Sequence, residues 1–322
     1  MKLNRCIARC AWLIVSLAAT PDLALALEPS PVLVDERFDS YNDQASFEAV
    51  WRPANPMNLP PDDLQLGVLI PDISANVPSP NDFPPNLEGK AVYIRDALNV
   101  YAGAAQPELD FLTPTPTQSI KLSADIFDDG LNNKRTTVGL RSTVAPLGVN
   151  VIELGRFNAP TFDPTNPTGD PIPPTGFAYR VFGFDPSSVP LLSQPGWQYF
   201  PLDPSLDGPD SNALVSPNDV GQGWHRYSAE IGVDFVTLVL DLFRDGVDNA
   251  TGLPGVDSTV TWHIAARPDP FDRLQFGGPT GVRSALGSVI DNIRLERVDV
   301  IPEPSTALLL AIGWLALRRR LR

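Results

Sequence analysis

The sequence predicts an all-β protein whose body, residues 27–300, is an antiparallel β-sandwich of two sheets. Period-two alternation of apolar and polar residues recurs along this body, and no long stretch shows helical periodicity. Proline accounts for 35 of the 322 residues, about twice its ordinary share, and the excess lies between apolar runs, where it forms loops. These observations together indicate many short strands joined by irregular connections.

The first 26 residues have the composition of a secretory signal peptide. Lys2, Arg5 and Arg9 form a basic region, residues 11–19 are apolar, and Ala24-Leu25-Ala26 is a small-residue cleavage site. The order of these features favours export and removal by signal peptidase over a buried N-terminal helix. Both cysteines lie in this segment, so the mature protein is predicted to have no disulfide and no thiolate metal site.

The predicted strands of the body have one face in the core and the other in water. In the clearest of them Ile120, Leu122, Ala124 and Ile126 point one way and polar residues point the other. Similar alternation occurs in the runs 227–231, 236–242, 260–264 and 293–295. Two strands are followed by Asp-Gly pairs, at 129–130 and 245–246, which indicate hairpin turns, and neither segment has the ligand spacing of an EF-hand loop.

Two proline-dense stretches interrupt these strands. Residues 53–87 contain nine prolines and residues 156–222 contain thirteen. Because proline cannot donate to a ladder, we predict long loops here rather than central strands. Whether the second stretch divides the body into two subregions near residue 190 stays open.

The last 22 residues form a short hydrophobic tail with a charged end. Pro302, Glu303, Pro304 and Ser305 are followed by an apolar run, so that residues 305–317 carry no charge. Eleven to thirteen helical residues reach about 17 to 20 Å, against about 30 Å of hydrocarbon, which predicts a short transmembrane anchor rather than a durable span. A buried amphipathic helix fits less well, because the run is apolar all round. The tail ends in the basic residues Arg318, Arg319, Arg320 and Arg322, which belong on the cytoplasmic side.

These tail residues resemble the PEP-CTERM sorting signal of Gram-negative bacteria. The resemblance covers residues 301–322 and implies recognition and cleavage by an exosortase, in organisms that make abundant exopolysaccharide. It also implies a protein that is anchored transiently in the inner membrane and then reaches the cell surface or the extracellular space.

Segments at both ends of the body resemble the first and last strands of concanavalin A-like and carbohydrate-binding-module jelly rolls. The opening run is residues 36–41, and the closing runs are residues 271–278 and 288–296. In that fold the first and last strands are adjacent, and acids beside them often hold a structural cation. The resemblance therefore implies a jelly roll and nominates Glu36, Asp39 and Asp291 as ligands of a structural Ca²⁺; the alternative is surface acids that bind no ion. No other cofactor is predicted.

The sequence contains none of the usual catalytic patterns. It has no serine-hydrolase elbow, zinc-protease helix, P-loop or dinucleotide fingerprint, and no E-x-D-x-x-E strand of the kind used by laminarinase-type glycanases. His225 and His263 each follow a tryptophan in a predicted strand, where packing is favoured over catalysis or metal binding. We therefore predict a non-catalytic protein; the alternative is a divergent polysaccharide-active hydrolase or lyase whose acids come from distant strands.

Binding of sugar needs only an exposed aromatic face with a few polar groups beside it. Trp197 and Tyr199, in the second proline-dense stretch, are the candidates for such a platform, with exopolysaccharide as the partner; the alternative is that they pack this loop onto the core. The formal charge is −14, and the basic ends contribute +2 and +3, so the body carries −19. Nucleic acid is therefore excluded as a partner of the body, and membrane contact is left to the C-terminal segment.

Overall fold

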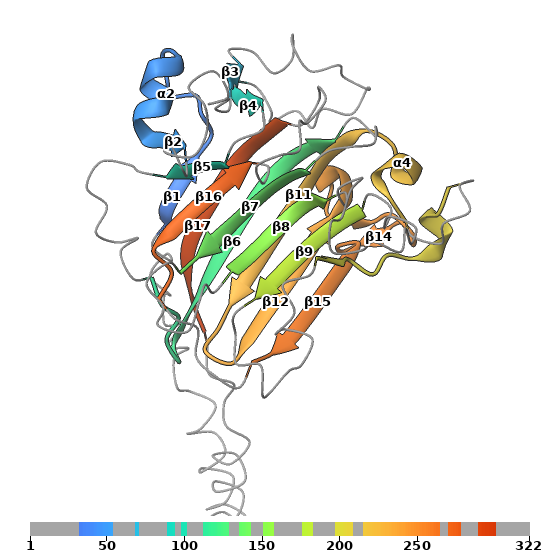
Figure 1. Cartoon of the computed structure of the whole chain (residues 1–322). Coiled ribbons are helices and arrows are strands. Elements are labelled where there is room, and N and C mark those ends of the chain that lie inside the picture. Colours follow the sequence, from blue (N-terminus) through green and yellow to red (C-terminus); the bar gives the residue numbers. More distant parts are fainter. Residues whose placement is uncertain are drawn as a thin grey trace, which may run out of the picture. The chain divides into compact units, whose positions relative to one another are not determined.

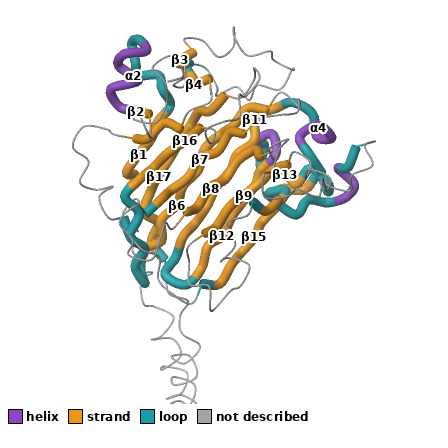
Figure 2. The backbone as a smooth tube through the Cα atoms, viewed as in Figure 1, coloured by secondary structure: helices purple, strands orange, loops and turns teal. Residues whose placement is uncertain are grey.

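The computed structural model describes residues 32–53, 68–70, 89–93, 98–101, 112–128, 135–142, 151–157, 176–182, 197–208, 215–264, 270–277 and 289–300. The chain divides into two compact units, Met1–Ser30 and Pro31–Arg322, and every residue in these ranges belongs to the second. Most of them form antiparallel strands in two large sheets (Figures 1 and 2). The predicted all-β sandwich is confirmed.

The larger sheet has eight strands within the described ranges. Seven follow the order β15, β12, β11, β6, β17, β4, β3, and β1 pairs with β17. Buried residues alternate with partly exposed ones along β12 and most of β11, as expected for strands with one face in water. The strands are β1 Val32–Glu36, β3 Val68–Ile70, β4 Ala91–Tyr93, β6 Gln118–Asp128, β11 Gly223–Ile231, β12 Phe235–Asp241, β15 Ser258–His263 and β17 Val289–Asp299.

The smaller sheet has seven described strands, in the order β10, β9, β8, β7, β16, β5, β2. Its pattern differs from that of the larger sheet, because all seven residues of β8 are buried, so both faces of this strand are covered. The strands are β2 Trp51–Pro53, β5 Leu98–Tyr101, β7 Arg135–Arg141, β8 Val151–Phe157, β9 Gly176–Phe182, β10 Gln198–Tyr199 and β16 Arg273–Gly277.

Short helices and one small hairpin complete the described part of the chain. Helix α2 begins after Asp43, whose side chain accepts a hydrogen bond from the backbone of Ser46 at 2.8 Å, while Ser46 Oγ accepts one from the Asp43 backbone at 3.1 Å. The helix buries Phe47. The remaining elements are α2 Gln44–Val50, η3 Pro204–Leu206, α4 Pro217–Val220, η4 Leu242–Arg244 and the β13 Val247–Asp248, β14 Leu253–Pro254 hairpin.

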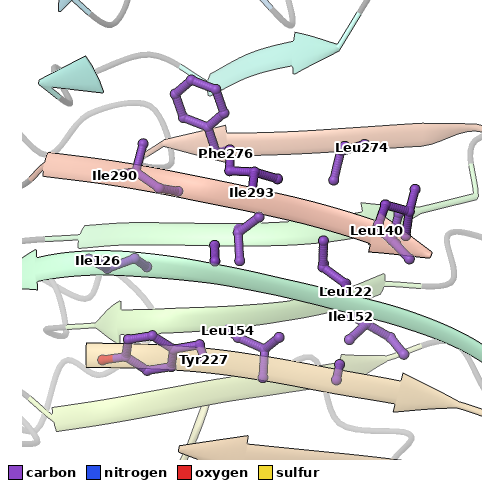
Figure 3. Packing of buried hydrophobic residues seen from close by; sticks show 14 of the residues in the cluster. Leu122, Ile126, Leu140, Ile152, Leu154, Tyr227, Leu274, Phe276, Ile290 and Ile293 are labelled. Atoms are coloured by element: carbon purple, nitrogen blue, oxygen red, sulfur yellow. The ribbon is translucent and has the colours of Figure 1, made fainter. Parts of the chain in front are cut away.

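The hydrophobic core lies between the two sheets. Ile152 and Leu154 of the smaller sheet and Leu122 and Ile126 of the larger sheet lie in this layer (Figure 3). Each of these side chains is at most 1% exposed, and full burial of an aliphatic side chain contributes about 1.5 to 3 kcal/mol. The alternating residues named from the sequence therefore supply this core.

The predicted adjacency of the first and last strands is confirmed, because β1 pairs antiparallel with β17. The predicted opening strand, residues 36–41, was placed too far along the chain, because β1 ends at Glu36. The chain then bends at Phe38, whose φ of 59° lies in the left-handed region. The Glu36 carboxylate stabilises this bend by accepting a hydrogen bond from the Phe38 backbone at 2.7 Å. The closing runs form β16 and β17 as predicted, although these strands belong to different sheets.

The interpretation of residues 156–222 as loop throughout was wrong. Strand β9, Gly176–Phe182, lies between β8 and β10 in the smaller sheet. Its seven residues contain no proline and include Phe177, Tyr179 and Val181 on the core face, so the prolines bound the strand without interrupting it. Residues 53–87 similarly contain β3.

The first Asp-Gly segment does not lie between paired strands, and the second lies in the long connection between β12 and β15, which pair antiparallel. Strand β6 leads to β7 in the other sheet, and β12 leads to η4 and the small hairpin before β15. The similarity of the two segments has another basis, because β6 and β12 both flank β11, where Asp125 and Asp241 are the register partners of Arg226.

Both predicted targeting segments lie outside the described residues. This applies to the signal peptide with Ala24 and Ala26, and to the tail with Pro302, its neighbours and the terminal arginines. Within the ranges that the structure describes, no helix has the length and apolar character needed to cross a bilayer.

Candidate functional site

The first predicted ligand of a cation, Glu36, is buried and satisfied by donors of the protein itself. Its carboxylate accepts hydrogen bonds from the Phe38 backbone, from Tyr41 Oη at 2.5 Å and from Trp51 Nε1 at 3.2 Å. Burial, and then the hydrogen bond to Glu36, raise the pKa of Tyr41. Glu36 thus ties the bend after β1 to the start of β2.

The second predicted ligand, Asp39, is also engaged by the protein. Its side chain accepts a hydrogen bond from the Lys90 backbone at 2.8 Å, and the Lys90 ammonium donates to the Asp39 carbonyl oxygen at 3.3 Å. Among the residues that the structure describes, no three Asp, Glu, His or Cys side chains are grouped so that they could hold a metal ion. The structure therefore does not bring Glu36, Asp39 and Asp291 together as one ligand set, and the cation stays a prediction.

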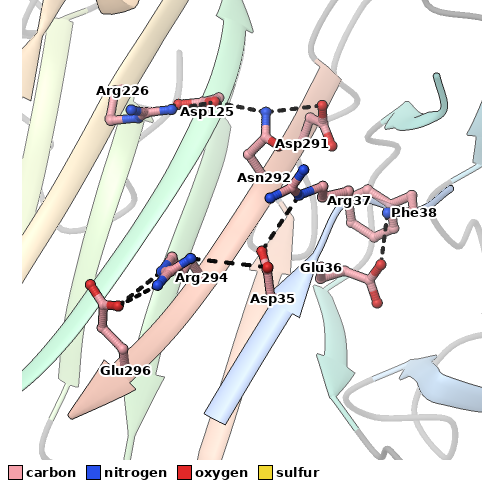
Figure 4. Close-up of polar contacts among 10 residues, drawn as sticks. All are labelled: Asp35, Glu36, Arg37, Phe38, Asp125, Arg226, Asp291, Asn292, Arg294 and Glu296. Carbon is pink, nitrogen blue, oxygen red and sulfur yellow. Dashed lines mark hydrogen bonds and ion pairs between the residues drawn. The ribbon is translucent and has the colours of Figure 1, made fainter. Parts of the chain in front are cut away.

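The third predicted ligand, Asp291, lies beside a β-bulge of β17. The register of β17 against β6 shifts between Asp291 and Arg294, and Asn292 there has a φ of 51°. The bulge lets the Asn292 amide donate to Asp125 at 2.9 Å and to Asp291 at 3.1 Å (Figure 4). Burial, together with the charges of Asp125 and Asp39, raises the pKa of Asp291 to about 8. At neutral pH Asp291 therefore mostly holds a proton.

Two arginines compensate the charge of the neighbouring Asp125, which is fully buried. Arg226 donates to it from Nε at 2.8 Å and from Nη2 at 3.1 Å, and Arg244 Nη1 lies 2.8 Å from its Oδ2. Arginine and asparagine side chains thus occupy the space around these carboxylates on β6 and β17 of the larger sheet.

The two aromatic residues predicted as a sugar platform lie together on the outer face of the smaller sheet. Phe200 faces the core, and alternation places Tyr199 on the opposite side, in register with Ala178. A Cβ atom on Gly176 would lie 2.3 Å from the Tyr199 ring, so this ring lies over a position without a side chain. Trp197 stacks on Phe157, with ring centroids 4.5 Å apart and planes inclined by 18°.

Trp197 and Tyr199 are both half-buried, so each contributes to packing and keeps part of its ring exposed. We call Phe157, Trp197 and Tyr199 the aromatic group. Burial raises the pKa of the Tyr199 hydroxyl, which therefore stays protonated at neutral pH and can serve as donor as well as acceptor.

The same outer face carries a polar group that the sequence analysis did not identify. Glu153 lies at its centre and is 3% exposed. Its carboxylate accepts hydrogen bonds from Arg141, through Nη2 and through Nε at 3.2 Å, and from Gln275 Nε2 at 3.0 Å, and Arg180 Nη1 lies 3.8 Å from its other oxygen. Three strands besides β8 thus contribute to this group.

Register alignment extends the polar group across the sheet. Arg52, Gln275, Glu153 and Arg180 occupy one level, because each pairs through successive strands with the next. Arg273 lies one step away along β16, in register with Arg141. We call this set the arginine face; it comprises Arg52, Arg141, Glu153, Arg180, Arg273 and Gln275.

The histidines take no part in either group. His225 is fully buried, accepts a hydrogen bond from the Phe243 backbone through Nδ1 at 3.2 Å and has its pKa lowered to about 3 by burial and by the charge of Arg156. It is therefore neutral at physiological pH and packs as an aromatic ring against Phe177. His263 is exposed at the edge strand β15.

The sequence contained one signal that could have identified the arginine face, namely charged residues within otherwise apolar runs. Glu153 and Arg180 each interrupt runs of apolar residues in β8 and β9. The sequence could not show that these strands are neighbours, because residues 158–175 separate them and β9 was predicted to be loop.

Comparison with known proteins gives structural similarity only. No protein-family model matches the chain, and no curated protein matches it. Among solved structures, it is similar to the CBM2 module of the evolved Dit of Lactobacillus casei BL23 phage J-1, with 13% identity over 76% of this chain and 93% of that chain and a TM-score of 0.38.

Two further similar structures are of the same kind. Domain 4 of AbnA, a GH43 extracellular arabinanase from Geobacillus stearothermophilus, solved with arabinotriose, shares 12% identity over 87% of this chain and 99% of that chain, with a TM-score of 0.35. Lectin I-B4 from Griffonia simplicifolia shares 10% identity over 73% of this chain and all of that chain, with a TM-score of 0.36. Because these TM-scores are below 0.5, the fold assignment rests on strand order and register.

Proposed function

We propose that this chain is an exported, non-catalytic β-sandwich that binds polysaccharide through the outer face of its smaller sheet. The observation that carries the proposal is the position of the aromatic group on the same sheet face as the arginine face. Partly exposed rings offer a surface for the apolar face of a pyranose ring, and the arginine and amide donors beside them suit sugar oxygens.

Small residues separate the two groups on this face. Gly155 and Ala178 occupy the level of Tyr199, which lies between the level of Phe157 and the row that contains Glu153 and Arg180. Adjacent levels on one face are two residues apart along a strand, a distance of about 7 Å. An extended sugar chain lying along this direction would meet an aromatic ring first and charged donors next.

Binding is favoured over hydrolysis by the state of Glu153. Its oxygens are held by Arg141, Gln275 and Arg180, so this carboxylate positions the donors around it and is poorly placed to attack a sugar or to move a proton. A retaining glycosidase requires two carboxylates about 5 Å apart, and the described strands place Glu153 on this face without a second acid.

Substitution of Trp197 tests the binding proposal. We expect Trp197→Ala to weaken binding to exopolysaccharide in affinity gels about three- to ten-fold, because the stacking surface is lost, and Trp197→Phe to retain most of the binding. Phe235→Ala, which removes an aromatic ring from the larger sheet, is the matched control and is expected to bind as the wild type does. Thermal unfolding of each variant verifies that it is folded.

Unchanged binding by folded Trp197→Ala would contradict the proposed platform. Release of reducing sugar or of unsaturated ends by the wild-type protein, lost on substitution of a single acid, would instead support a hydrolase or lyase.

We also propose that the protein reaches the outside of a Gram-negative cell through its two terminal segments. The order of basic region, apolar run and Ala24-Leu25-Ala26 supports cleavage by signal peptidase. The Pro302-Glu303-Pro304-Ser305 run before a short apolar stretch and terminal arginines supports sorting by an exosortase after transient anchoring in the inner membrane.

Replacement of Pro302-Glu303-Pro304 by alanines tests the sorting proposal. We expect an uncleaved precursor that stays in the membrane fraction, detected by immunoblot of membrane and medium. Alanine substitution of residues 253–255, which are exposed, provides a matched control away from the tail. Processing and release equal to those of the wild type would contradict recognition by an exosortase.

A further inference from the structure

We propose that the polysaccharide bound by this protein is anionic, with carboxylate or sulfate groups that the arginine face recognises. The inference rests on the proposed function and names the class of its ligand. The six residues of the arginine face include four arginines and one glutamate, a formal charge of +3, on a body whose charge is −19.

The arginine side chains retain contact with solvent. Arg52 is exposed and Arg273 is half-buried, while the side chains of Arg141 and Arg180 are 26% and 23% exposed. A ligand can therefore reach guanidinium groups at several points around the buried Glu153. Guanidinium suits this task, because its planar donors bind carboxylate or sulfate oxygens in pairs.

Strand register places like charges opposite each other on this face. Arg273 and Arg141 are direct cross-strand partners, and alternation puts both side chains on the side away from Leu140 and Leu274 of the core. Two like charges in this arrangement destabilise a sheet. An anionic group bound between them would remove that repulsion.

The outer face of the larger sheet has the opposite arrangement. Lys121 is the cross-strand partner of both Glu230 and Glu296, and Arg226 is the partner of both Asp125 and Asp241. Charges there are neutralised by their neighbours, so the unpaired Arg52 and Arg273 are a local feature of the described part of the smaller sheet and do not follow from the general composition.

Two arginines of the arginine face make no ion pair with its glutamate. Glu153 is engaged by Arg141 and lies 3.8 Å from Arg180, and Arg180 makes a further contact of its own. Among the residues that the structure describes, neither Arg52 nor Arg273 has an ion-pair partner. These two guanidinium groups are the ones most available to a ligand.

The acidic charge of the rest of the body would favour binding of an anionic ligand at the arginine face over binding elsewhere. A body charge of −19 repels polyanions from most of the surface, and this repulsion extends only about 10 Å at ordinary ionic strength. Contact is then favoured where local positive charge outweighs the average, which is the arginine face.

Paired polymers of equal backbone test the inference with the full mature protein. Sodium alginate is compared with carboxyl-reduced alginate, and dextran sulfate with dextran, in affinity gels and by titration calorimetry. We expect the charged member of at least one pair to bind ten-fold or more tightly than its neutral counterpart, and this preference to fall as salt is raised from 50 to 200 mM. The pair that responds distinguishes a carboxylated ligand from a sulfated one.

Charge-removing variants locate the effect. Arg52→Gln and Arg273→Gln, which leave no described carboxylate without its partner, are each expected to weaken binding of the anionic polymer about three- to five-fold, the upper range for an exposed ion pair. Arg294→Gln removes the same charge from the outer face of the larger sheet, where the side chain is 40% exposed, and is expected to leave binding unchanged.

The outcomes separate the two proposals. Equal affinity for the charged and neutral members of both pairs overturns the anionic ligand and leaves polysaccharide binding standing. Preferential binding that Arg52→Gln, Arg273→Gln and Arg294→Gln all affect equally overturns recognition by the arginine face. Failure of all four polymers to bind overturns both proposals.

Discussion

The two sheets of this sandwich share the same core but differ on their outer faces. On the larger sheet, cross-strand neighbours carry opposite charges, as Lys121 does between Glu230 and Glu296, and the outward side chains of β12 are partly exposed. On the smaller sheet, outward side chains such as Glu153 and Gln275 are buried, 3% and 1% exposed. The two outer faces therefore differ in how their outward side chains are buried and paired.

Buried polar groups cost free energy unless they are hydrogen-bonded, and charged ones cost more. Glu153 meets this condition only because Arg141 and Gln275 reach it from neighbouring strands. On the larger sheet, Asp125 is buried in the same way and is compensated by Arg226 and Arg244, whereas the outward residues of β12 are partly exposed and need no such partners. The buried polar group of the smaller sheet differs in its neighbours, because the aromatic group lies on the same sheet face, in agreement with the proposed role in binding.

Removal of the central carboxylate should have the largest effect on this contrast. We expect Glu153→Gln to lower the free energy of unfolding by about 3 kcal/mol, because the neighbouring Arg141 and Arg180 lose the charge that compensates them. Glu296→Gln, which breaks the pair with the partly exposed Arg294 at 2.8 Å, should cost less than about 1 kcal/mol. Urea denaturation measures both, and similar losses in the two variants would contradict the distinction between the faces.

Titration of Asp291, on β17 of the larger sheet, should produce a smaller effect. Its pKa is about 8 in the folded protein against an ordinary 3.8, so the folded state holds a proton that the unfolded state releases, and stability falls as pH rises between these values. Below about pH 6.5 the lowered pKa of His225 acts in the opposite direction, and Asp241, whose pKa is raised to about 6, adds to the Asp291 effect.

The window from pH 6.5 to 8 isolates Asp291 among these three groups. There we expect the wild type to lose on the order of 1 to 2 kcal/mol, and Asp291→Asn, which mimics the protonated acid, to show a flatter dependence. The midpoint of thermal unfolding as a function of pH measures both, and parallel curves for the two proteins would disprove the assignment.

Chelation should have the smallest effect. Because Glu36 is hydrogen-bonded to Phe38, Tyr41 and Trp51, and Asp291 holds a proton near neutral pH, we expect excess EDTA to shift the midpoint of thermal unfolding by less than about 1 °C. A marked fall that Ca²⁺ reverses would show instead that an ion stabilises the protein by mass action.

Much of the fold was predictable from local patterns. Alternation identified the strands that became β6, β11, β12, β15 and β17, because the period of two is set by strand geometry wherever one face is buried. Alternation did not identify β9, because the flanking prolines led us to predict a loop there. It also did not predict that β8 is buried on both faces.

The candidate site was predictable only in part. Trp197 and Tyr199 were proposed from their residue types, and the structure places them on one sheet face with Phe157 as a stacking partner. Glu36, Asp39 and Asp291 were predicted as cation ligands from a resemblance; each accepts a hydrogen bond from the protein, and the cation stays a prediction.

By itself, the amino-acid sequence determined which side chains of each regular strand face the core, since that depends on residues two positions apart. Tertiary structure alone decided which outward side chains meet: Glu153 and Gln275 are 122 residues apart in the chain, and Arg273 and Arg141 are 132 apart. Such pairings depend on strand order and register, which are set by long-range packing of the whole core, and no local pattern specifies them.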